Sequence, residues 1–329
     1  MYINRRNFLI AGGALTISGQ CFGATASNTN PLLSGVNLSG GEYNAGSSRL
    51  YWDYVYPSTA EIDYYASKGF KALRIPILCD RMLLNQTSTT DASIIYNLIL
   101  YAQKYSMKII IDVHQFGYMD QGLVGVTPSA TAAFVAFWGT MAKLLKSQSN
   151  VIFGLMNEPN AQSATEWVNA ANAAIAAIRQ AGASQLILVS GSYWTGAWTW
   201  TSTNNSGVMP SVIDPIKNFA FEVHQYLDFD GSGTHPTVVL GSGSSRLVDF
   251  TNWARSYRFK GFLGEFGFAS NPSAMQEGQN LLAYMSKNSD VWLGWSYWAG
   301  GPWVGNYMFS VEPANNVDKP QMQVLSQYM

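Results

Sequence analysis

Short apolar runs alternate with longer segments of helical periodicity from about residue 33 to the end of the chain. This alternation is typical of βα units built around a parallel sheet. Eight runs have the length and composition of buried strands: residues 35–38, 72–76, 108–113, 151–155, 186–189, 219–223, 261–264 and 291–295. Helical spacing predicts helices between them. These helices cover residues 60–67, 92–104, 130–146, 165–181, 246–257, 273–287 and, as a short final helix, 321–328.

The order of these elements predicts an α/β fold, a (β/α)8 TIM barrel that forms a single domain over residues 27–329. Active sites in such barrels lie at the carboxyl ends of the strands. Residues 191–218 are rich in Trp, Thr, Ser and Asn and show little helical periodicity, so we expect a long loop there. No Pro-rich or Ser-rich linker interrupts the chain after residue 27, which favours one domain over two.

Residues 1–26 have the pattern of a twin-arginine export signal. Arg5 and Arg6 precede a short apolar run at residues 10–17, and Ala24-Thr25-Ala26 has the form of a cleavage site. The apolar run is too short to span a bilayer, which argues against an uncleaved anchor. We therefore expect a bacterial protein that is exported to the periplasm or secreted, with cleavage after Ala26.

Composition narrows the range of partners. The chain has 329 residues and a net charge of −1, and it carries no basic cluster beyond its first residues. This charge balance argues against nucleic acid or an anionic membrane surface as a binding partner, and it favours an uncharged substrate. Of the two cysteines, Cys21 would leave with the signal and Cys79 would be the single cysteine of residues 27–329, so we expect no disulfide.

Two glutamates follow predicted strands that are far apart in the sequence. Glu158 lies just after the strand at 151–155, and Glu265 lies at the end of the strand at 261–264. In a barrel both carboxylates reach the same face, where we expect them to approach to about 5 Å, the separation used by retaining glycosidases. One carboxylate then attacks the anomeric carbon while the other protonates the departing oxygen.

Further polar and aromatic residues fall at the ends of predicted strands. These residues are Arg74, His114, His224, Tyr226 and Trp298. A fixed cation such as Arg74 can hold a nearby carboxylate in its ionised form. A structural salt bridge is the alternative for Arg74, although such residues are more usual at the opposite face of a barrel. Core packing is the alternative for Trp298.

Three motifs together resemble glycoside hydrolase family 5: Asn157-Glu158-Pro159, Gly264-Glu265-Phe266-Gly267 and Arg74-Ile75-Pro76. The segment from His224 to Thr234, which begins His-Gln-Tyr-Leu-Asp, is similar to the fungal-type endoglucanases of that family. The resemblance extends over nearly all of residues 27–329. It implies a cellulase that acts on β-1,4-glucan or cello-oligosaccharides.

The resemblance also assigns roles at the point of cleavage. It makes Glu158 the general acid and base, and Glu265 the nucleophile. It implies that Asn157 hydrogen-bonds the 2-hydroxyl of the sugar there and that His114 contacts the same sugar.

The remaining residues have supporting roles by the same resemblance. His224 supports the acid/base, and Trp298 stacks under the sugar ring. Tyr226 and Arg74 hold the nucleophile, and we expect them to lower the pKa of Glu265 because they stabilise its charged form.

Neither a metal nor a cofactor is expected. Residues 228–233 match the first half of an EF-hand loop, but Val239 stands where the bidentate Glu belongs, so a tight turn is the better interpretation. His114 and His224 are not spaced as a zinc motif. Within the long loop Trp194, Trp198 and Trp200 are candidates for stacking on outer sugars, and packing against the barrel is the alternative.

Two other functions remain open at this level. An endo-β-1,4-mannanase would use the same barrel and carboxylates, because only detailed contacts in the sugar-binding subsites distinguish the axial 2-hydroxyl of mannose. A catalytically silent glycan-binding barrel is the alternative from another class, and the presence of both carboxylates argues against it. A retaining mechanism also permits transfer of the glycosyl group to a second sugar.

Overall fold

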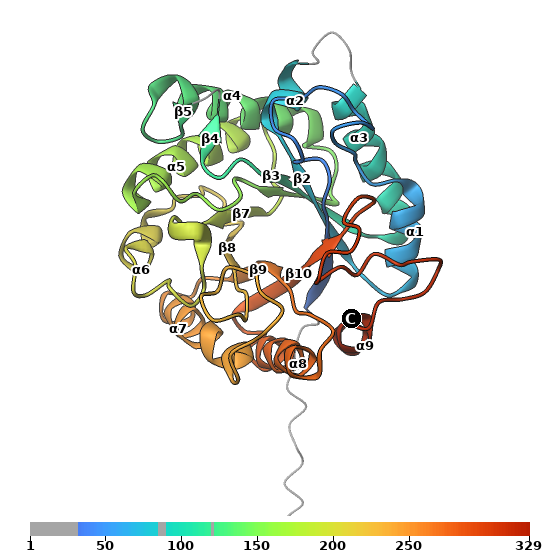
Figure 1. The fold of residues 1–329 in the computed structure, drawn as a ribbon. Coiled ribbons are helices and arrows are strands. Elements are labelled where there is room, and N and C mark those ends of the chain that lie inside the picture. The colour runs from blue at the N-terminus through green and yellow to red at the C-terminus, as the bar shows by residue number, and fades with distance from the viewer. Residues whose placement is uncertain (1–31, 85–89, 120–121) are drawn as a thin grey trace, which may run out of the picture.

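The computed structural model describes residues 32–84, 90–119 and 122–329. The predicted export signal at residues 1–26 lies outside the described residues. Eight parallel strands close into a barrel, and the helices form a ring around it (Figure 1). The strands follow the order β1-β10-β9-β8-β7-β6-β3-β2, and pairing of β10 with β1 closes the barrel. The predicted TIM barrel is therefore confirmed.

All eight predicted strands are present. Their bounds are β1 (Leu33–Leu38), β2 (Ala72–Ile77), β3 (Lys108–Val113), β6 (Val151–Gly154), β7 (Ile187–Ser190), β8 (Phe219–His224), β9 (Gly261–Phe266) and β10 (Trp292–Gly300). The strands β8, β9 and β10 extend further than the apolar runs predicted. Glu265 and Trp298 consequently lie within strands, and His224 is the last residue of β8.

The predicted helices are also confirmed, with ends shifted by a few residues. The helices are α1 (Thr59–Ser67), α3 (Thr90–Ala102), α4 (Pro128–Leu145), α5 (Ala164–Gln180), α7 (Ser242–Tyr257), α8 (Pro272–Lys287) and α9 (Met322–Leu325). Elements too short to show a period were missed, namely α2 (Cys79–Leu84), α6 (Asn205–Val208) and the hairpin of β4 (Tyr118–Met119) with β5 (Gly122–Leu123). None of the described helices is long and apolar enough to cross a membrane.

The interior of the barrel changes from apolar to charged along the strands. A layer of buried side chains fills one end, consisting of Ala72, Ile110, Ile152, Leu188, Ala220 and Phe262. Because side chains alternate along a strand, the residues two positions later face the same interior. These residues include Arg74, Asp112 and Glu222, and all three are buried. The carboxyl end of the barrel is therefore a buried polar layer.

A shift of register between β8 and β9 brings Glu265 into this layer. Glu222 pairs with Phe262, but His224 pairs with Glu265, so β9 carries one additional residue, Gly264. Such a bulge re-aims the side chains that follow it. Gly264 is needed here because a Cβ at this position would lie 2.1 Å from Oε1 of Glu222.

Glu61, in the first turn of α1, makes the stability of the fold depend on pH. Its Oε2 accepts the backbone N–H of Ser58 at 2.6 Å and caps α1, whereas its Oε1 has no hydrogen-bond partner among the described residues. Burial raises the pKa of Glu61 to about 7, and the charge of Glu312 adds to the shift. Since the folded pKa lies above the unfolded value, stability is present at low pH and falls as the pH rises toward 7.

We expect Glu61→Gln to stabilise the protein at pH 8 by roughly 1–3 kcal/mol and to have little effect at pH 4. The amide oxygen still accepts from Ser58, but the side chain no longer loses a proton. Urea unfolding at both pH values measures the difference. The control is Glu166→Gln, in the equivalent cap that Ser163 forms on α5. Glu166→Gln should not stabilise the protein at pH 8, and equal stabilisation by both variants would contradict the prediction.

Candidate active site

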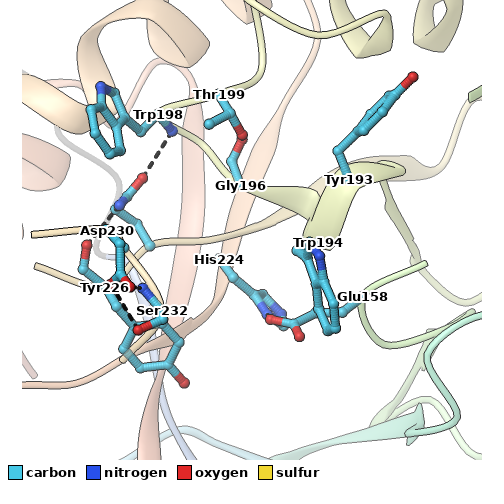
Figure 2. A pocket seen from close by; sticks show the side chains of 12 residues that line it. Glu158, Tyr193, Trp194, Gly196, Trp198, Thr199, His224, Tyr226, Asp230 and Ser232 are labelled. Carbon is cyan, nitrogen blue, oxygen red and sulfur yellow. Dashed lines mark hydrogen bonds and ion pairs between the residues drawn. The ribbon is translucent and has the colours of Figure 1, made fainter. Parts of the chain in front are cut away.

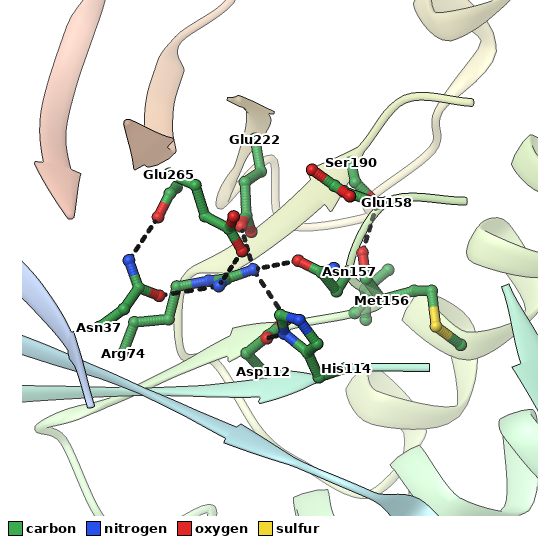
Figure 3. Close-up of polar contacts among 12 residues, drawn as sticks. Asn37, Arg74, Asp112, His114, Met156, Asn157, Glu158, Ser190, Glu222 and Glu265 are labelled. Atoms are coloured by element: carbon green, nitrogen blue, oxygen red, sulfur yellow. Dashed lines mark hydrogen bonds and ion pairs between the residues drawn. The ribbon is translucent and has the colours of Figure 1, made fainter. Parts of the chain in front are cut away.

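Arg74 lies at the centre of the buried polar layer (Figure 3). Its Nη1 is 3.0 Å from Oε1 of Glu265. Its Nη2 is 2.9 Å from Oε1 of Glu222 and 3.0 Å from Oδ1 of Asp112. Burial lowers the pKa of Arg74, but the three carboxylates outweigh it and raise the pKa above its ordinary value. The guanidinium therefore remains charged and offsets three buried acids.

Both oxygens of Glu265 are held by donors. Oε1 accepts from Arg74, and Oε2 accepts from the hydroxyl of Tyr226 at 2.8 Å. The sequence interpretation expected Arg74 and Tyr226 to lower the pKa of this carboxyl. The charge of Arg74 does lower it, but the expected net direction was wrong. Burial raises the pKa of Glu265, and the opposing charges of His224 and Arg74 do not fully compensate.

Glu158 occupies a strained turn after β6. Its φ of +42° lies in the left-handed region, which residues other than glycine seldom adopt. The turn is held by Asn157, whose backbone N–H donates to the carbonyl of Val113 at 2.7 Å. The side chain of Glu158 is 16% exposed, against 6% for that of Glu265. Of the two carboxylates, Glu158 is thus the one that solvent or a ligand reaches more easily.

The two carboxylates and His224 form one cluster. One oxygen from each glutamate and one ring nitrogen of His224 all lie within 4.8 Å of one another. Nδ1 of His224 is 2.7 Å from Oε1 of Glu158. The oxygens of Glu158 and Glu265 are therefore as close as a retaining double displacement requires.

His224 is enclosed by acids. Besides Glu158, its Nδ1 faces Glu265 at 3.6 Å, and its Nε2 lies 3.3 Å from Oε1 of Glu222. Burial lowers the pKa of His224, but Glu265, Glu158 and Glu222 together raise it to about 10. The ring is consequently an imidazolium at neutral pH.

His114, Trp298 and Asn157 complete the set predicted from the sequence. The ring of His114 stacks on Trp298 with centroids 5.4 Å apart, and its Nδ1 lies 2.7 Å from Oδ2 of Asp112. Oδ1 of Asn157 accepts from Arg74 at 2.9 Å, whereas its buried Nδ2 has no hydrogen-bond partner among the described residues. All eight predicted residues therefore belong to one connected cluster.

Three residues of the cluster were missed. Asn37 accepts from Nη1 of Arg74 at 2.8 Å and donates to the carbonyl of Gly264 at 2.9 Å. The other two are Asp112 and Glu222, each placed two positions before a predicted histidine. Because alternate residues of a strand share a face, this spacing was a signal that could have found both acids.

A cavity of about 380 Å³ opens beside Glu158 and His224. Figure 2 shows Trp194 next to these two side chains and Trp198 on the other side of the cavity. The backbone N–H of Trp194 donates to the carbonyl of Pro159 at 3.2 Å, which fixes this tryptophan to the turn that carries Glu158.

The three tryptophans of the long loop have different environments. Trp194 and Trp198 are 56% and 45% exposed and line the cavity. The guanidinium of Arg246 lies 4.3 Å from the ring centroid of Trp198. Trp200, in contrast, is fully buried against Phe250 and other core rings, so its interpretation as a sugar-stacking residue was wrong. Its alternative, packing against the barrel, is confirmed.

Asp228 supports the tight turn predicted for residues 228–233. Its carboxylate accepts backbone N–H groups from Gly233 at 3.0 Å and Thr234 at 3.1 Å. Asp228, Asp230 and His235 are close enough to share a cation, but these oxygens of Asp228 already bind the loop. In the other group of possible metal ligands, which is Glu158, His224 and Glu265, the carboxylate of Glu265 already accepts hydrogen bonds from Arg74 and Tyr226.

A closed (β/α)8 barrel with two carboxylate oxygens within 4.8 Å of each other at the carboxyl ends of its strands has the fold and the paired acids of a retaining glycoside hydrolase. The model of the cellulase family, glycosyl hydrolase family 5, matches residues 25–301, and the chain belongs to this family.

Relatives of known activity agree with this assignment. Endo-beta-1,4-glucanase B of Aspergillus niger is 36% identical over 285 residues, which cover 85% of this chain and 84% of the relative. The solved structure of XacCel5A in complex with cellopentaose is 40% identical, with a TM-score of 0.87 and coverage of 90% of this chain and 98% of that one. Endoglucanase Cel5A of Pseudomonas stutzeri in complex with cellobiose is 30% identical, with a TM-score of 0.82 and coverage of 90% and 92%.

Proposed function

We propose that this protein is an endo-β-1,4-glucanase that hydrolyses internal bonds of β-1,4-glucan with retention of configuration. The observation that carries the proposal is the pair of carboxylates, Glu158 and Glu265, with oxygens within 4.8 Å of each other in a member of family 5. Relatives whose structures contain cellopentaose and cellobiose support glucan over mannan as the substrate.

Glu265 is the proposed nucleophile. Arg74 and Tyr226 each bind one of its oxygens, which fixes the carboxylate in position for attack on the anomeric carbon. The attack forms a glycosyl ester with Glu265 and releases the leaving oxygen. This ester is uncharged, so the field at the second carboxylate changes between the two steps of the reaction.

Glu158 is the proposed acid/base, because it lines the cavity beside the cluster and is the more exposed of the two carboxyls. It protonates the leaving oxygen in the first step. In the second step it takes a proton from water, which attacks the anomeric carbon, breaks the bond between that carbon and Glu265, and restores the free carboxylate. Both displacements invert the anomeric carbon, so the product retains the configuration of the substrate.

The sugar at the cleavage point is proposed to lie between Asn157 and the stacked pair of His114 and Trp298. The buried Nδ2 of Asn157 is a donor without a partner among the described residues, which suits a hydrogen bond to the 2-hydroxyl. The half-buried face of Trp298 suits the apolar face of a pyranose ring.

Viscosity and reducing ends measured together test the activity. The purified protein is expected to lower the viscosity of carboxymethylcellulose quickly while it produces few new reducing ends, and to leave a β-1,4-mannan unchanged. Proton NMR of the first products should show the β anomer. Cleavage of mannan alone would replace glucanase by mannanase, and no cleavage of either polymer would contradict the proposal.

Trp194 is expected to bind the leaving part of the substrate, because it stands beside Glu158 in the cavity. Trp194→Ala should lower kcat/KM for cellopentaose roughly threefold to tenfold, the loss of one stacking contact. An aryl β-cellobioside with a small activated leaving group provides the internal control and should be cleaved at nearly the wild-type rate. An equal loss on both substrates would contradict this placement of Trp194.

Export by the twin-arginine route is proposed from the sequence alone. The support is the pair Arg5 and Arg6, the short apolar run and the cleavage pattern that ends at Ala26. The mature protein is expected to begin at Ser27, which N-terminal sequencing of the exported form measures. Recovery of the full chain only from the cytoplasm would overturn the proposal.

A further inference from the structure

Glu222 contacts the partners of both proposed catalytic carboxylates, although it has no role in the mechanism above. It is a buried residue of β8, and its Oε1 lies 2.9 Å from Nη2 of Arg74 and 3.3 Å from Nε2 of His224. The tight contact with Gly264 of β9 leaves this carboxylate no room on one side. Glu222 is therefore fixed between the cation that holds Glu265 and the ring that holds Glu158.

The two ring nitrogens of His224 both face carboxylate oxygens. Nδ1 is 2.7 Å from Glu158, and Nε2 is 3.3 Å from Glu222. An ionised carboxylate only accepts hydrogen bonds, whereas a neutral imidazole has one N–H and one lone pair. The lone pair of a neutral ring cannot face this oxygen of Glu222 without repulsion, because the oxygen that lies 2.9 Å from Nη2 of Arg74 presents lone pairs of its own. A proton that Glu222 holds on Nε2 therefore leaves Nδ1, which faces Glu158, as the ring nitrogen that can gain or lose a proton.

We propose that Glu222 is a positioning residue that keeps a proton on Nε2 of His224 and so directs Nδ1 toward Glu158. The inference rests on the proposed function, in which Glu158 is the acid/base. His224 donates from Nδ1 to Oε1 of Glu158 and from Nε2 to Glu222. This leaves Oε2 of Glu158 as the oxygen that carries the proton for the leaving group, so the donor has a fixed direction.

The charges around His224 support this role. The groups that face or surround the ring are Glu158 after β6, Glu265 in β9, Glu222 in β8, Asp112 in β3 and Arg74 in β2. The carboxylates nearest the ring outweigh its burial and keep it positive. If Glu222 loses its charge, the ring keeps only two of its three adjacent acids, while Arg74 is less completely offset. The affinity of His224 for its second proton then falls.

Glu222→Gln tests the proposal, because the amide keeps the shape and an acceptor oxygen but not the charge. The chain has three histidines, so ring nitrogen-15 NMR of histidine-labelled protein is well resolved, and His224→Asn identifies the signal. We expect the pKa of His224 to fall by more than about one unit in the variant. We also expect kcat on cellopentaose to fall roughly tenfold or more and the alkaline limb of its pH profile to move to lower pH.

Glu277→Gln is the matched control. Glu277 is a buried carboxylate outside the cluster that accepts the backbone N–H groups of Gly241 and Gly243 at 2.9 and 2.8 Å. This variant should leave both the His224 titration and the pH profile unchanged. An unchanged titration and profile in Glu222→Gln would overturn the proposal.

The wild-type protein gives a second test that does not depend on the folding of any variant. A proton on Nε2 of His224 throughout the pH range of the native state supports the proposal, and a ring protonated on Nδ1 alone overturns it. The NMR result requires no turnover. Failure of the proposed glucanase activity is therefore distinguishable from failure of this inference.

Discussion

Replacing Glu265 with Gln is expected to abolish hydrolysis and leave the fold intact. The amide is nearly the same size as the carboxyl and can still bind Arg74 and Tyr226, but it cannot form the glycosyl ester. We expect kcat/KM for cellopentaose to fall by more than about three orders of magnitude. The circular dichroism spectrum should be unchanged. Near wild-type turnover in this variant would refute the assignment of Glu265 as nucleophile.

Azide distinguishes the roles of the two carboxylates. In Glu265→Gly a small anion can attack the anomeric carbon from the vacated nucleophile side, so an activated β-cellobioside should yield the α-glycosyl azide. In Glu158→Gly the ester with Glu265 still forms, and azide then replaces water and yields the β-glycosyl azide. Proton NMR of the products reads the anomeric configuration directly. The reverse stereochemistry would exchange the two roles.

Replacing Arg74 with Ala is expected to give the largest loss of stability. The side chain is completely buried and contacts Asp112, Glu222 and Glu265, which would become uncompensated buried charges. Breaking a buried ion pair from one side is strongly destabilising, by roughly 3–5 kcal/mol. Because the three acids can take up protons, the loss should diminish as the pH falls. Urea unfolding at pH 5 and pH 8 measures both effects.

Arg255→Ala is the matched control for Arg74→Ala. Arg255 forms a bidentate ion pair with Asp290, but their side chains are 41% and 56% exposed. Exposed pairs of this kind contribute little, so the expected loss is below about 1 kcal/mol. Equal losses of stability in the two variants would contradict the prediction, because they would mean that Arg74 does not stabilise the buried carboxylates Asp112, Glu222 and Glu265.

The sequence predicted the barrel and the proposed catalytic residues because both follow from local patterns. Each strand is a short apolar run, and each site residue stands within or just after such a run. Parallel strands in a barrel direct their carboxyl ends to the same face, so position along a strand was sufficient to place Glu158 and Glu265 together. The same argument placed Arg74, His114 and His224.

The sequence could not distinguish residues of similar local context. Trp198 and Trp200 stand two positions apart in one loop, yet only Trp198 lines the cavity and Trp200 packs in the core. The loop has no period from which to predict the direction of a side chain. Its course depends on contacts with distant segments, such as the hydrogen bond from the backbone of Trp198 to Gln225 at 2.8 Å.

By itself, then, the sequence determined the order of the strands and which side chains stand at their carboxyl ends, because these follow from the spacing of apolar residues. Only the tertiary structure decided how the charges balance. Arg74 and Glu265 are 191 positions apart, and their contact exists because the barrel closes. Closure of the barrel also places Asp112 and Glu222 against Arg74 and excludes water from the carboxyl of Glu265. Burial therefore raises the pKa of Glu265, where the sequence predicted a lowered pKa. Desolvation depends on everything that surrounds a group, and no local pattern contains that information.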